Sequence, residues 1–344
     1  MRKMATIRKI DNISPIDGAD MIEVATVGGW KVVVKKGEYQ EGQMAVYLEI
    51  DSFVPHPLAP FLSKGEPREY MGIKGERLRT VKLKGQVSQG ILLPLYVLAN
   101  NKIYTHEEGS DVSEQLGVVK WEPESSAQIQ GQAKGTFPSF IKKTDQERCQ
   151  NLKREIKESF DNKEQFEATL KMDGSSITVY YLDGEIGICS RNQELKINDE
   201  NKDNTFIKTA FDSGLVNALM RFGANIAVQG ELMGPGIQGN REGLTKHNIY
   251  VYDIFNIDTF SYLSPDERMD VYAELKGCKD AEFEHVPVLD KAFVLSDDSI
   301  DSLLEYAEGP SLNNPIREGI VFKSRSREFS FKAISNKFLL KTGG

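Results

Sequence analysis

The sequence predicts an α+β protein made of two domains. Residues typical of strands dominate the first hundred positions, whereas residues 122–139 are poor in large apolar side chains and rich in Ser, Gln, Gly and Pro. The remaining residues alternate strand-like and helix-like runs. With 344 residues, 40% of them hydrophobic and 27% charged, the chain is long enough for two domains of ordinary size. We therefore expect domains at residues 1–121 and 140–344, joined by a linker at residues 122–139.

The first domain is expected to be a small closed β-barrel. β-Branched and aromatic residues fill positions 21–34 and 44–55, and the glycine-containing segment between them is typical of a turn. A further extended pair spans residues 77–95 and is interrupted by Gly85 and Gly90. Several short strands at this spacing within about a hundred residues favour an OB-like barrel.

Basic side chains gather in and near the last of these extended segments. They are Lys74, Arg77, Arg79, Lys82 and Lys84. Alternate positions of a strand point to the same face, so two or three of these side chains could share one face. Two interpretations stay open: a solvated edge kept basic to prevent edge-to-edge pairing, or a surface that contacts the phosphates of a nucleic acid.

The second domain is expected to combine antiparallel strands with a few helices. Residues 166–192 indicate an antiparallel meander with a turn at Asp183-Gly184. Residues 206–223 have the apolar spacing of one helix that ends at a glycine, and residues 264–275 begin at a Ser-Pro helix start. Three further apolar runs are predicted to be buried strands; they occupy residues 225–234, 248–255 and 317–324.

Composition excludes several classes of protein. No apolar run approaches the roughly 18 residues that span a bilayer, and the N-terminus lacks the apolar core of a signal peptide, so we expect a soluble, intracellular protein. Three scattered cysteines and four scattered histidines indicate reduced thiols and no metal-binding pattern. The net charge of −8 argues against a protein that coats nucleic acid generally, so any contact with a polyanion must be local.

Several strands of the second domain carry or end on polar residues. A strand that only fills a core would avoid such residues. In chain order they are Lys171, Asp173, Arg191, Glu231, Tyr252, Asp253, Glu318 and Lys332. A short pattern such as Lys-Met-Asp-Gly often arises by chance, but the whole series in one order does not. Together the residue types indicate nucleotidyl transfer through a lysine.

The lysine needs help from its neighbours for such chemistry. With an ordinary pKa of about 10.4 a lysine is protonated at neutral pH, and it cannot attack phosphorus until a nearby cation or burial lowers that pKa. Asp173 and Glu318 offer the hard oxygen ligands that Mg²⁺ prefers, directly or through water. Lys332 offers a fixed positive charge for a phosphate.

The other members of the series suit a nucleoside, although each has a simpler interpretation. Arg191 and Glu231 can hold ribose hydroxyls, or they can form a plain ion pair. Tyr252 offers a flat face for a purine, but a tyrosine on a strand is more often a core residue. Lys323 can contact a phosphate or be a surface lysine at the end of a strand.

These stretches resemble the six motif blocks of the covalent nucleotidyltransferases, the superfamily of ligases and capping enzymes. The blocks are residues 171–174, 190–192, 230–234, 249–253, 318–323 and 331–337. The sequences GELMGPG and FKAISNKF resemble the RNA ligase branch, and with the predicted OB domain in front the chain is similar to the RNA ligase 5 family. The resemblance implies an N-terminal OB-fold β-barrel followed by a nucleotidyltransferase (ATP-grasp-like ligase) domain built on antiparallel sheets with flanking helices.

The resemblance also implies an activity, that of an ATP-dependent RNA ligase. ATP would adenylylate Lys171 with release of pyrophosphate, AMP would pass to a 5′-phosphate RNA end, and a 3′-OH would attack that end, as in RNA nick repair. Asp173 and Glu318 would position a divalent metal, Mg²⁺ or Mn²⁺. The implied partner is RNA in the form of a nicked duplex, and we expect a monomer.

The implied nucleotide contacts extend over the second domain. They involve Arg148, Leu170, Ser176, Arg191, Glu231, Tyr252, Lys323 and Lys332. Lys332 would contact the α-phosphate and Arg148 the outer phosphates, while Ser176 stays open between a phosphate contact and a simple strand start. Where related RNA ligases can carry a second lysine in the last motif, this chain has Ile334. Either Lys337 or Arg148 compensates, or the phosphates are held differently.

RNA contact is assigned to Arg77, Arg79, Lys82 and Lys84. Because the sequence ends twelve residues after Lys332, we expect no C-terminal OB domain, which disfavours a capping enzyme or a conventional DNA ligase. Two alternatives stay open: a nucleic-acid-binding OB protein with a non-catalytic ligase-like domain, and an ATP-dependent DNA ligase.

Overall fold

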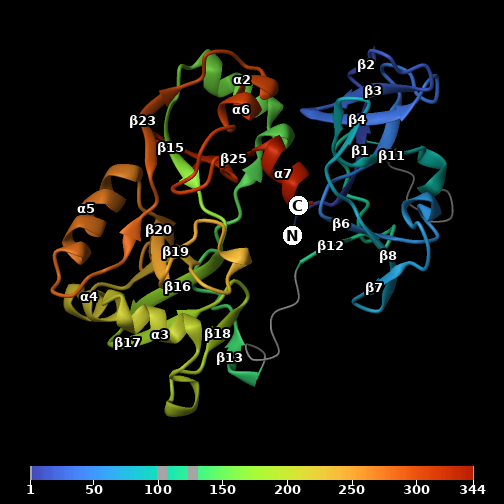
Figure 1. Cartoon of the computed structure of the whole chain (residues 1–344). Helices are drawn as coiled ribbons and strands as arrows, with labels where there is room; N and C mark the ends of the chain where they lie inside the picture. Colours follow the sequence, from blue (N-terminus) through green and yellow to red (C-terminus); the bar gives the residue numbers. More distant parts are fainter. Residues whose placement is uncertain (1, 99–106, 123–130, 344) are drawn as a thin grey trace. The chain divides into compact units, whose positions relative to one another are not determined.

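The computed structural model describes residues 2–98, 107–122 and 131–343 (Figure 1). Contacts divide the chain into two compact units. Unit 1 comprises Met1–Glu124, Cys149–Glu155 and Asn336–Gly344, and unit 2 comprises Ser125–Arg148 and Ile156–Ser335. Two segments that the sequence assigns to the second domain, residues 149–155 and 336–344, therefore pack with the first unit. Residues 123–130 of the predicted linker lie outside the described residues.

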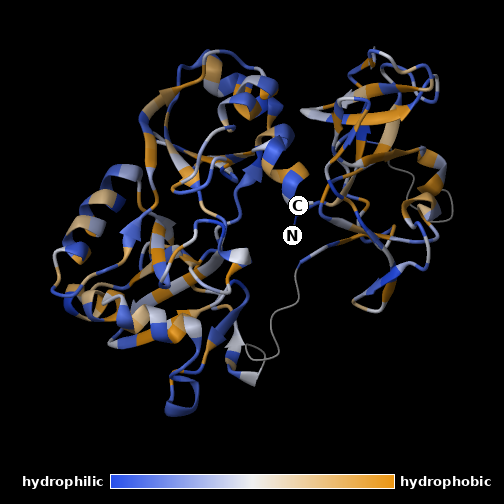
Figure 2. Cartoon of the chain, in the orientation of Figure 1, coloured by the Kyte–Doolittle hydropathy of each residue, from blue (hydrophilic) through white to orange (hydrophobic). Residues whose placement is uncertain are grey.

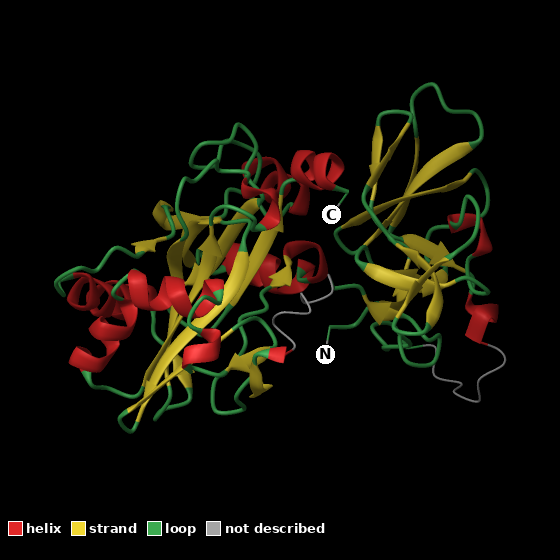
Figure 3. Cartoon of the chain, turned by 60° about the horizontal axis from the view of Figure 1, so that its bottom comes forward, coloured by secondary structure: helices red, strands yellow, loops and turns green. Residues whose placement is uncertain are grey.

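Unit 1 is built from short antiparallel strands (Figure 3). Their sheets have the orders β1-β5-β11, β2-β3-β4, β12-β6-β8-β7 and β10-β9. The bounds are β1 Ala5–Lys9, β2 Asn12–Pro15, β3 Ile22–Val27, β4 Trp30–Lys35, β5 Met44–Leu48, β6 Ser52–Pro55, β7 Arg68–Tyr70, β8 Ile73–Arg77, β9 Val81–Leu83, β10 Gln86–Ser88, β11 Ile91–Leu93 and β12 Val119–Lys120. Short helical turns lie at Pro60–Leu62, Leu95–Leu98 and Cys149–Asn151, and helix α7 spans Asn336–Thr342.

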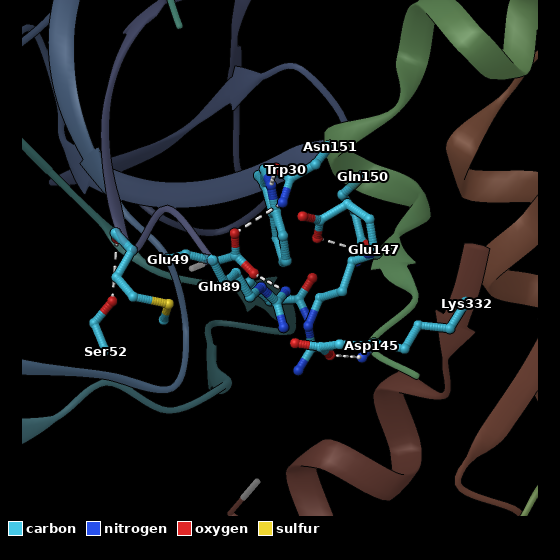
Figure 4. A network of polar contacts seen from close by, with 12 residues as sticks. Trp30, Glu49, Ser52, Gln89, Asp145, Glu147, Gln150, Asn151 and Lys332 are labelled. Carbon is cyan, nitrogen blue, oxygen red and sulfur yellow. Dashed lines mark hydrogen bonds and ion pairs between the residues drawn. The ribbon is translucent and has the colours of Figure 1, made fainter. Parts of the chain in front are cut away.

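Asn151 shows how a late segment of the chain joins unit 1. Its side-chain carbonyl accepts a hydrogen bond of 2.7 Å from the indole of Trp30, and its amide donates to Glu49 at 2.8 Å (Figure 4). The Gly29 amide donates to the Gln150 carbonyl at 2.9 Å. Trp30 is almost fully buried, and a buried indole N–H needs an acceptor, which here comes from a residue 121 positions away.

Unit 2 contains two sheets. One has the order β13-β18-β17-β16-β19-β20-β21, with β22 paired to β20, and the other has the order β14-β25-β24-β15-β23. The bounds are β13 Ala133–Thr136, β14 Glu147–Arg148, β15 Gln165–Lys171, β16 Ser175–Leu182, β17 Glu185–Cys189, β18 Gln193–Leu195, β19 Ile226–Met233, β20 Asn248–Asn256, β21 Ser261–Tyr262, β22 Glu284–His285, β23 Val288–Val294, β24 Gly319–Ser324 and β25 Ser330–Ile334. Figure 2 shows hydrophobic residues along these strands. The three predicted buried strands are confirmed as β19, β20 and β24.

One predicted meander is wrong, and the error matters for the site. The hairpin β16–β17 with its turn at Asp183-Gly184 is confirmed, and both turn residues have positive φ. However, β15 does not pair with β16; it pairs with β24 and β23 in the other sheet. The chain therefore crosses from one sheet to the other between Lys171 and Ser175. Local alternation could not reveal this because the partners of β15 lie far away in sequence.

The helices of unit 2 lie against its sheets (Figure 1). Their bounds are α2 Lys153–Asp161, which begins in unit 1, then α3 Thr205–Asp212, α4 Leu215–Phe222, α5 Pro265–Lys276 and α6 Ile300–Tyr306, with short turns at Asp199–Asn201 and Gln238–Asn240. The predicted single helix over 206–223 is wrong, because Gly214 has a φ of 73° and separates α3 from α4. A side chain there would also lie 2.4 Å from the Asp280 carbonyl. The helix start at Ser264 is confirmed by a complete capping box.

Among the residues that the structure describes, no helix combines the length and the apolar character required to cross a membrane. Within the described part of the chain, Cys149, Cys189 and Cys278 take part in no disulfide.

Candidate active site

Lys171 is the last residue of β15, at the point where the chain crosses between the two sheets of unit 2. The crossing is tight at Gly174: a Cβ on this residue would lie 2.5 Å from the Leu232 carbonyl oxygen. Real Cβ atoms essentially never come this close, so the crossing requires glycine here. Met172 is buried and fixes the middle of the crossing. The Lys-Met-Asp-Gly motif thus brings Lys171 and Asp173 into the space between the sheets.

Lys171 forms an ion pair with Glu318, which directly precedes β24. The distance from Nζ to the Glu318 Oε2 is 2.8 Å, and the lysine side chain is 25% exposed. Burial by itself would lower the pKa of Lys171, but the charges of Glu318 and Glu231 outweigh it and raise the pKa above its ordinary value. Without ligands, this lysine is therefore a protonated cation and not yet a nucleophile.

Two more carboxylates complete this cluster. Glu231 on β19 accepts a hydrogen bond of 2.9 Å from the Gly174 amide, and Asp173 pairs with Arg241 at 2.8 Å. Burial, with the charge of Glu318 added, raises the pKa of Asp173 to about 6. Burial likewise raises the pKa of Glu231 to about 7. In both residues burial outweighs the nearby cations, because a buried environment disfavours the charged form of a carboxylate.

The cluster suits a divalent cation in charge and donor chemistry. Asp173 and Glu318 present hard oxygens, but each already holds a cationic side chain. Within the described ranges, no group of three or more His, Cys, Asp or Glu side chains is spaced as a ready metal site. The residues therefore fit a metal that arrives with its own waters or with phosphate oxygens, and that displaces Arg241 or Lys171 from the carboxylates.

Tyr252 owes its orientation to an irregularity in β20. Gln229 pairs with Asp253, but Gly230 pairs with Val251, so Tyr252 is the extra residue of a β-bulge. A bulge turns a side chain away from simple alternation. The Tyr252 hydroxyl lies 3.1 Å from the Ser176 hydroxyl and 3.2 Å from the Thr144 hydroxyl. These contacts fix the hydroxyl end of the Tyr252 ring. Ser176 is therefore a hydrogen-bond partner of Tyr252 in this structure.

Lys323 is buried and lies beneath Tyr252. It donates to the Tyr252 backbone carbonyl, and its Nζ lies 2.6 Å from the Asp253 carboxylate. The Nζ is also 5.9 Å from the centroid of the Tyr252 ring. The interpretation of Lys323 as a surface lysine is therefore wrong, because it is only 7% exposed. This lysine joins the two sheets directly behind the bulge.

Arg148 and Lys332 are neighbours on the parallel strands β14 and β25. Lys332 Nζ lies 3.5 Å from the Asp145 carboxylate (Figure 4). Arg148 is buried. Ile334 is also buried, so position 334 belongs to the core. A lysine at this position would have to bury its charge. Compensation by Arg148, opposite Lys332 on β14, or by Lys337 stays a prediction.

The remaining sequence-assigned residues lie in contrasting surroundings. The Leu170 side chain is buried with Met172, Met233, Tyr250 and Val286, so only its backbone is available to a nucleotide. Arg191 is exposed and is the second residue after the end of β17.

In unit 1, the four residues assigned to RNA contact differ in availability. The Arg77 guanidinium lies 2.6 Å from Asp51 and stacks 3.8 Å from the centroid of the Trp121 ring. Arg79, Lys82 and Lys84 are exposed, and the last two stand on the hairpin β9–β10. We attribute a structural role to Arg77, whereas the hairpin lysines are open to a ligand.

Sequence reasoning missed Arg241, Thr144 and Asp145, which touch Asp173, Tyr252 and Lys332 respectively. Arg241 follows the glycine-rich stretch after β19. A positive charge so close to that stretch is the only feature of the sequence that could have marked Arg241 as a site residue. Thr144 and Asp145 lie in the segment just before β14 and reach Tyr252 and Lys332 only through the tertiary fold.

Comparison with known proteins agrees with this geometry. Residues 4–95 match the family model described as OB-fold domain, and residues 164–336 match the model described as RNA ligase. Fold and site therefore define a nucleotidyltransferase-type ligase that carries an N-terminal OB-fold domain. The chain belongs to the RNA ligase family. No curated protein sequence matched.

Several solved structures of a Naegleria gruberi RNA ligase are similar over nearly the whole chain. The structure with PPi is 44% identical, covers 98% of each chain and has a TM-score of 0.89. A mutant with AMP and Mn is also 44% identical, and another mutant with ATP and Mn is 43% identical. Both cover 98% of each chain and have TM-scores of 0.89. The agreement supports the expected RNA ligase 5 family architecture.

Proposed function

We propose that the protein is an ATP-dependent RNA ligase that seals 3′-OH and 5′-phosphate ends through a covalent adenylate on Lys171. The observation that carries this proposal is the position of Lys171 at the crossing between the sheets, 2.8 Å from Glu318 and surrounded by carboxylates. The solved Naegleria structures with ATP, AMP, Mn and PPi support ATP as the AMP donor and Mg²⁺ or Mn²⁺ as the cofactor.

In the first step, the Lys171 Nζ attacks the α-phosphorus of ATP, a nitrogen–phosphorus bond forms, and the bond to pyrophosphate breaks. A divalent cation, when bound, neutralises charge on the phosphate and lowers the pKa of the nearby lysine. Asp173 and Glu318 would hold that cation. Glu318 also accepts the hydrogen bond that orients Lys171. Lys332 and Arg148, side by side on β25 and β14, would bind the phosphates.

The nucleoside would lie on the face that carries Tyr252 and Glu231. The Tyr252 ring, held by Ser176 and Thr144, would stack on adenine, while Glu231 and Arg191 would bind the ribose hydroxyls. In the second step a 5′-phosphate oxygen of RNA displaces Lys171 from AMP. In the third step a 3′-OH attacks that phosphate, the new phosphodiester forms, and AMP leaves. We propose a nicked duplex as the substrate and RNA repair as its use.

Mass spectrometry after incubation with ATP and Mg²⁺ tests the first step. We expect a covalent adduct with the mass of AMP on Lys171, and we expect none in Lys171→Ala. If the protein forms no adduct with ATP, GTP or NAD⁺, the proposal is abandoned, and the alternative of a nucleic-acid-binding protein takes its place.

Sealing of nicked duplexes with RNA or DNA on either side of the break tests the substrate. We expect sealing to require RNA on the 3′-OH side. Equal rates with DNA on that side would instead favour the DNA ligase alternative. Two single-stranded RNAs without a complementary strand serve as the control that measures end joining.

A further inference from the structure

Arg268 is a fully buried arginine on α5, outside every motif of the active site. Its guanidinium pairs with Glu167 on β15, and its Nε donates to the Nε2 of His285 at 3.1 Å. His285 Nδ1 lies 2.6 Å from the Val286 carbonyl, so Nδ1 carries the proton and Nε2 is the acceptor. Burying a guanidinium completely is costly, so its partners must compensate it.

The Arg268 pair adjoins the ion pair behind Tyr252. Glu167 and Lys323 are directly opposite each other on β15 and β24, and opposite charges in such a position attract. Lys323 nevertheless binds Asp253 and the Tyr252 carbonyl. Glu167 is therefore a competing acceptor for Lys323, and it is occupied by Arg268.

The charges of this buried group balance. Arg268 and Lys323 are the two cations, and Glu167 and Asp253 are the two anions. His285 is neutral, because burial and the charge of Arg268 lower its pKa to about 4. Removing Arg268 would leave Glu167 as an uncompensated buried anion, and Lys323, directly opposite on β24, is the cation placed to compensate it.

We propose that Arg268 is a positioning residue for nucleotide binding: it occupies Glu167 and so keeps the Lys323 ammonium on Asp253 and on the Tyr252 carbonyl. Lys323 in turn fixes the bulge that directs the Tyr252 ring. The inference rests on the proposed function, in which Tyr252 stacks on adenine. Without Arg268, Lys323 turns toward Glu167, the bulge loosens, and ATP binds more weakly.

Three variants separate this role from a loss of stability: Arg268→Met, Glu167→Met and the double variant. The dissociation constant for ATP with Mg²⁺ is measured by calorimetry in a Lys171→Ala background, so that no adenylate forms, and KM and kcat of adenylylation are measured with Lys171 intact. We expect Arg268→Met to weaken ATP binding about tenfold, since a charge-assisted hydrogen bond is lost. For Glu167→Met and for the double variant, the dissociation constant for ATP should stay within about twofold of that of the parent protein. In neither variant is Glu167 present to compete for Lys323.

Thermal unfolding accompanies each measurement. Both single variants should be destabilised, so an ATP effect confined to Arg268→Met cannot come from stability alone. Equal weakening by both single variants, or a double variant as weak as Arg268→Met, overturns the proposal. If Arg268→Met does not fold, Arg268→Lys carries the test. This variant keeps a positive charge at position 268, so its dissociation constant for ATP should stay within about threefold of that of the parent protein. A tenfold loss of ATP affinity overturns the proposal.

The proposed function fails separately from this inference. A wild-type protein that forms no adduct and does not bind ATP refutes the function. A wild-type protein that does both, with Arg268→Met unchanged in ATP affinity, refutes only the role of Arg268.

Discussion

Lys171 is kept protonated by the carboxylates that surround it. Glu318 and Glu231 raise its pKa, so the lysine stays protonated until another cation takes over the carboxylates. Asp173 and Glu231 have raised pKa values themselves, chiefly because they are buried, with the negative charge of Glu318 adding to the rise. In the proposed mechanism, Asp173 and Glu318 would hold a divalent metal, whose positive charge would lower the pKa of Lys171.

The Tyr252 hydroxyl and the Tyr252 ring should contribute separately to ATP binding. Tyr252→Phe keeps the ring but loses the contacts with Ser176 and Thr144, so KM for ATP in adenylylation should rise about threefold to fivefold. Tyr252→Ala also loses the stacking surface, and KM should rise at least about tenfold more. Steady-state adenylylation kinetics measure both. Equal KM values for the two variants would exclude stacking on the ring.

Glu164 should make stability depend on pH in the acid range. Burial alone would raise its pKa, but hydrogen bonds from Arg327, Ser324 and Ser159 outweigh burial and lower the pKa from 4.5 to about 2. Since the folded state binds this proton more weakly than the unfolded state, the stabilisation is complete above pH 4.5 and is lost as the pH falls towards 2. It amounts to about 3 kcal/mol.

Urea unfolding of Glu164→Gln over this pH range measures that contribution. The variant should be less stable than the wild type at pH 7, and the difference should shrink steadily below pH 4.5. A difference that does not change with pH would mean that the carboxylate charge has no part in stability.

At the scale of the element, the crossing from β15 to β16 creates the site. It brings Lys171 from one sheet next to Glu231 from the other, and Gly174 is the residue that lets the backbones approach. The bulge at Tyr252 is the second such device, since it turns the ring without ending the strand.

Gly174→Ala should therefore damage stability and adenylylation together. The added Cβ would lie 2.5 Å from the Leu232 carbonyl, and relieving that contact must move one strand. We expect a loss of about 1–3 kcal/mol in the free energy of unfolding and a large drop in adduct formation. Gly135→Ala is the matched control, because nothing lies within 4 Å of its added Cβ. An active, stable Gly174→Ala would show that the crossing tolerates a side chain.

At the scale of the molecule, the chain passes between its two units four times, at residues 124/125, 148/149, 155/156 and 335/336. The predicted organisation has a single crossing in a linker. Strands β14 and β25, which carry Arg148 and Lys332, each lead directly into a segment that packs in unit 1. Cutting the chain at the predicted linker would therefore separate residues 149–155 and 336–344 from the part of unit 1 with which they pack.

The two units should divide the reaction between them. Lys82→Ala/Lys84→Ala removes two exposed charges from the β9–β10 hairpin, so nick sealing should weaken several-fold and become less sensitive to salt. Adenylylation by ATP should stay within about twofold. The control is Lys35→Ala/Lys36→Ala, which removes the same charge from another exposed part of unit 1. Equal losses in sealing and adenylylation would refute the division.

The sequence by itself determined the class of fold, the identity of most strands and the order of the motif residues. Alternation, turn residues and caps are local properties, so β19, β20, β24 and the start of α5 could be predicted from neighbouring positions. The types of residue at positions 171, 173, 231 and 318 likewise pointed to lysine-based nucleotidyl transfer before any contact was known.

Only the tertiary structure decided which strands pair and which charges are buried together. β15 pairs with β24 across about 150 residues, Tyr252 lies on a bulge, and Lys323 is a buried partner of Asp253. Arg268 gave no local signal, because its partners Glu167 and His285 come from other elements. The physical reason is that strand register and charge burial depend on residues brought together by folding, which no window of neighbouring residues contains.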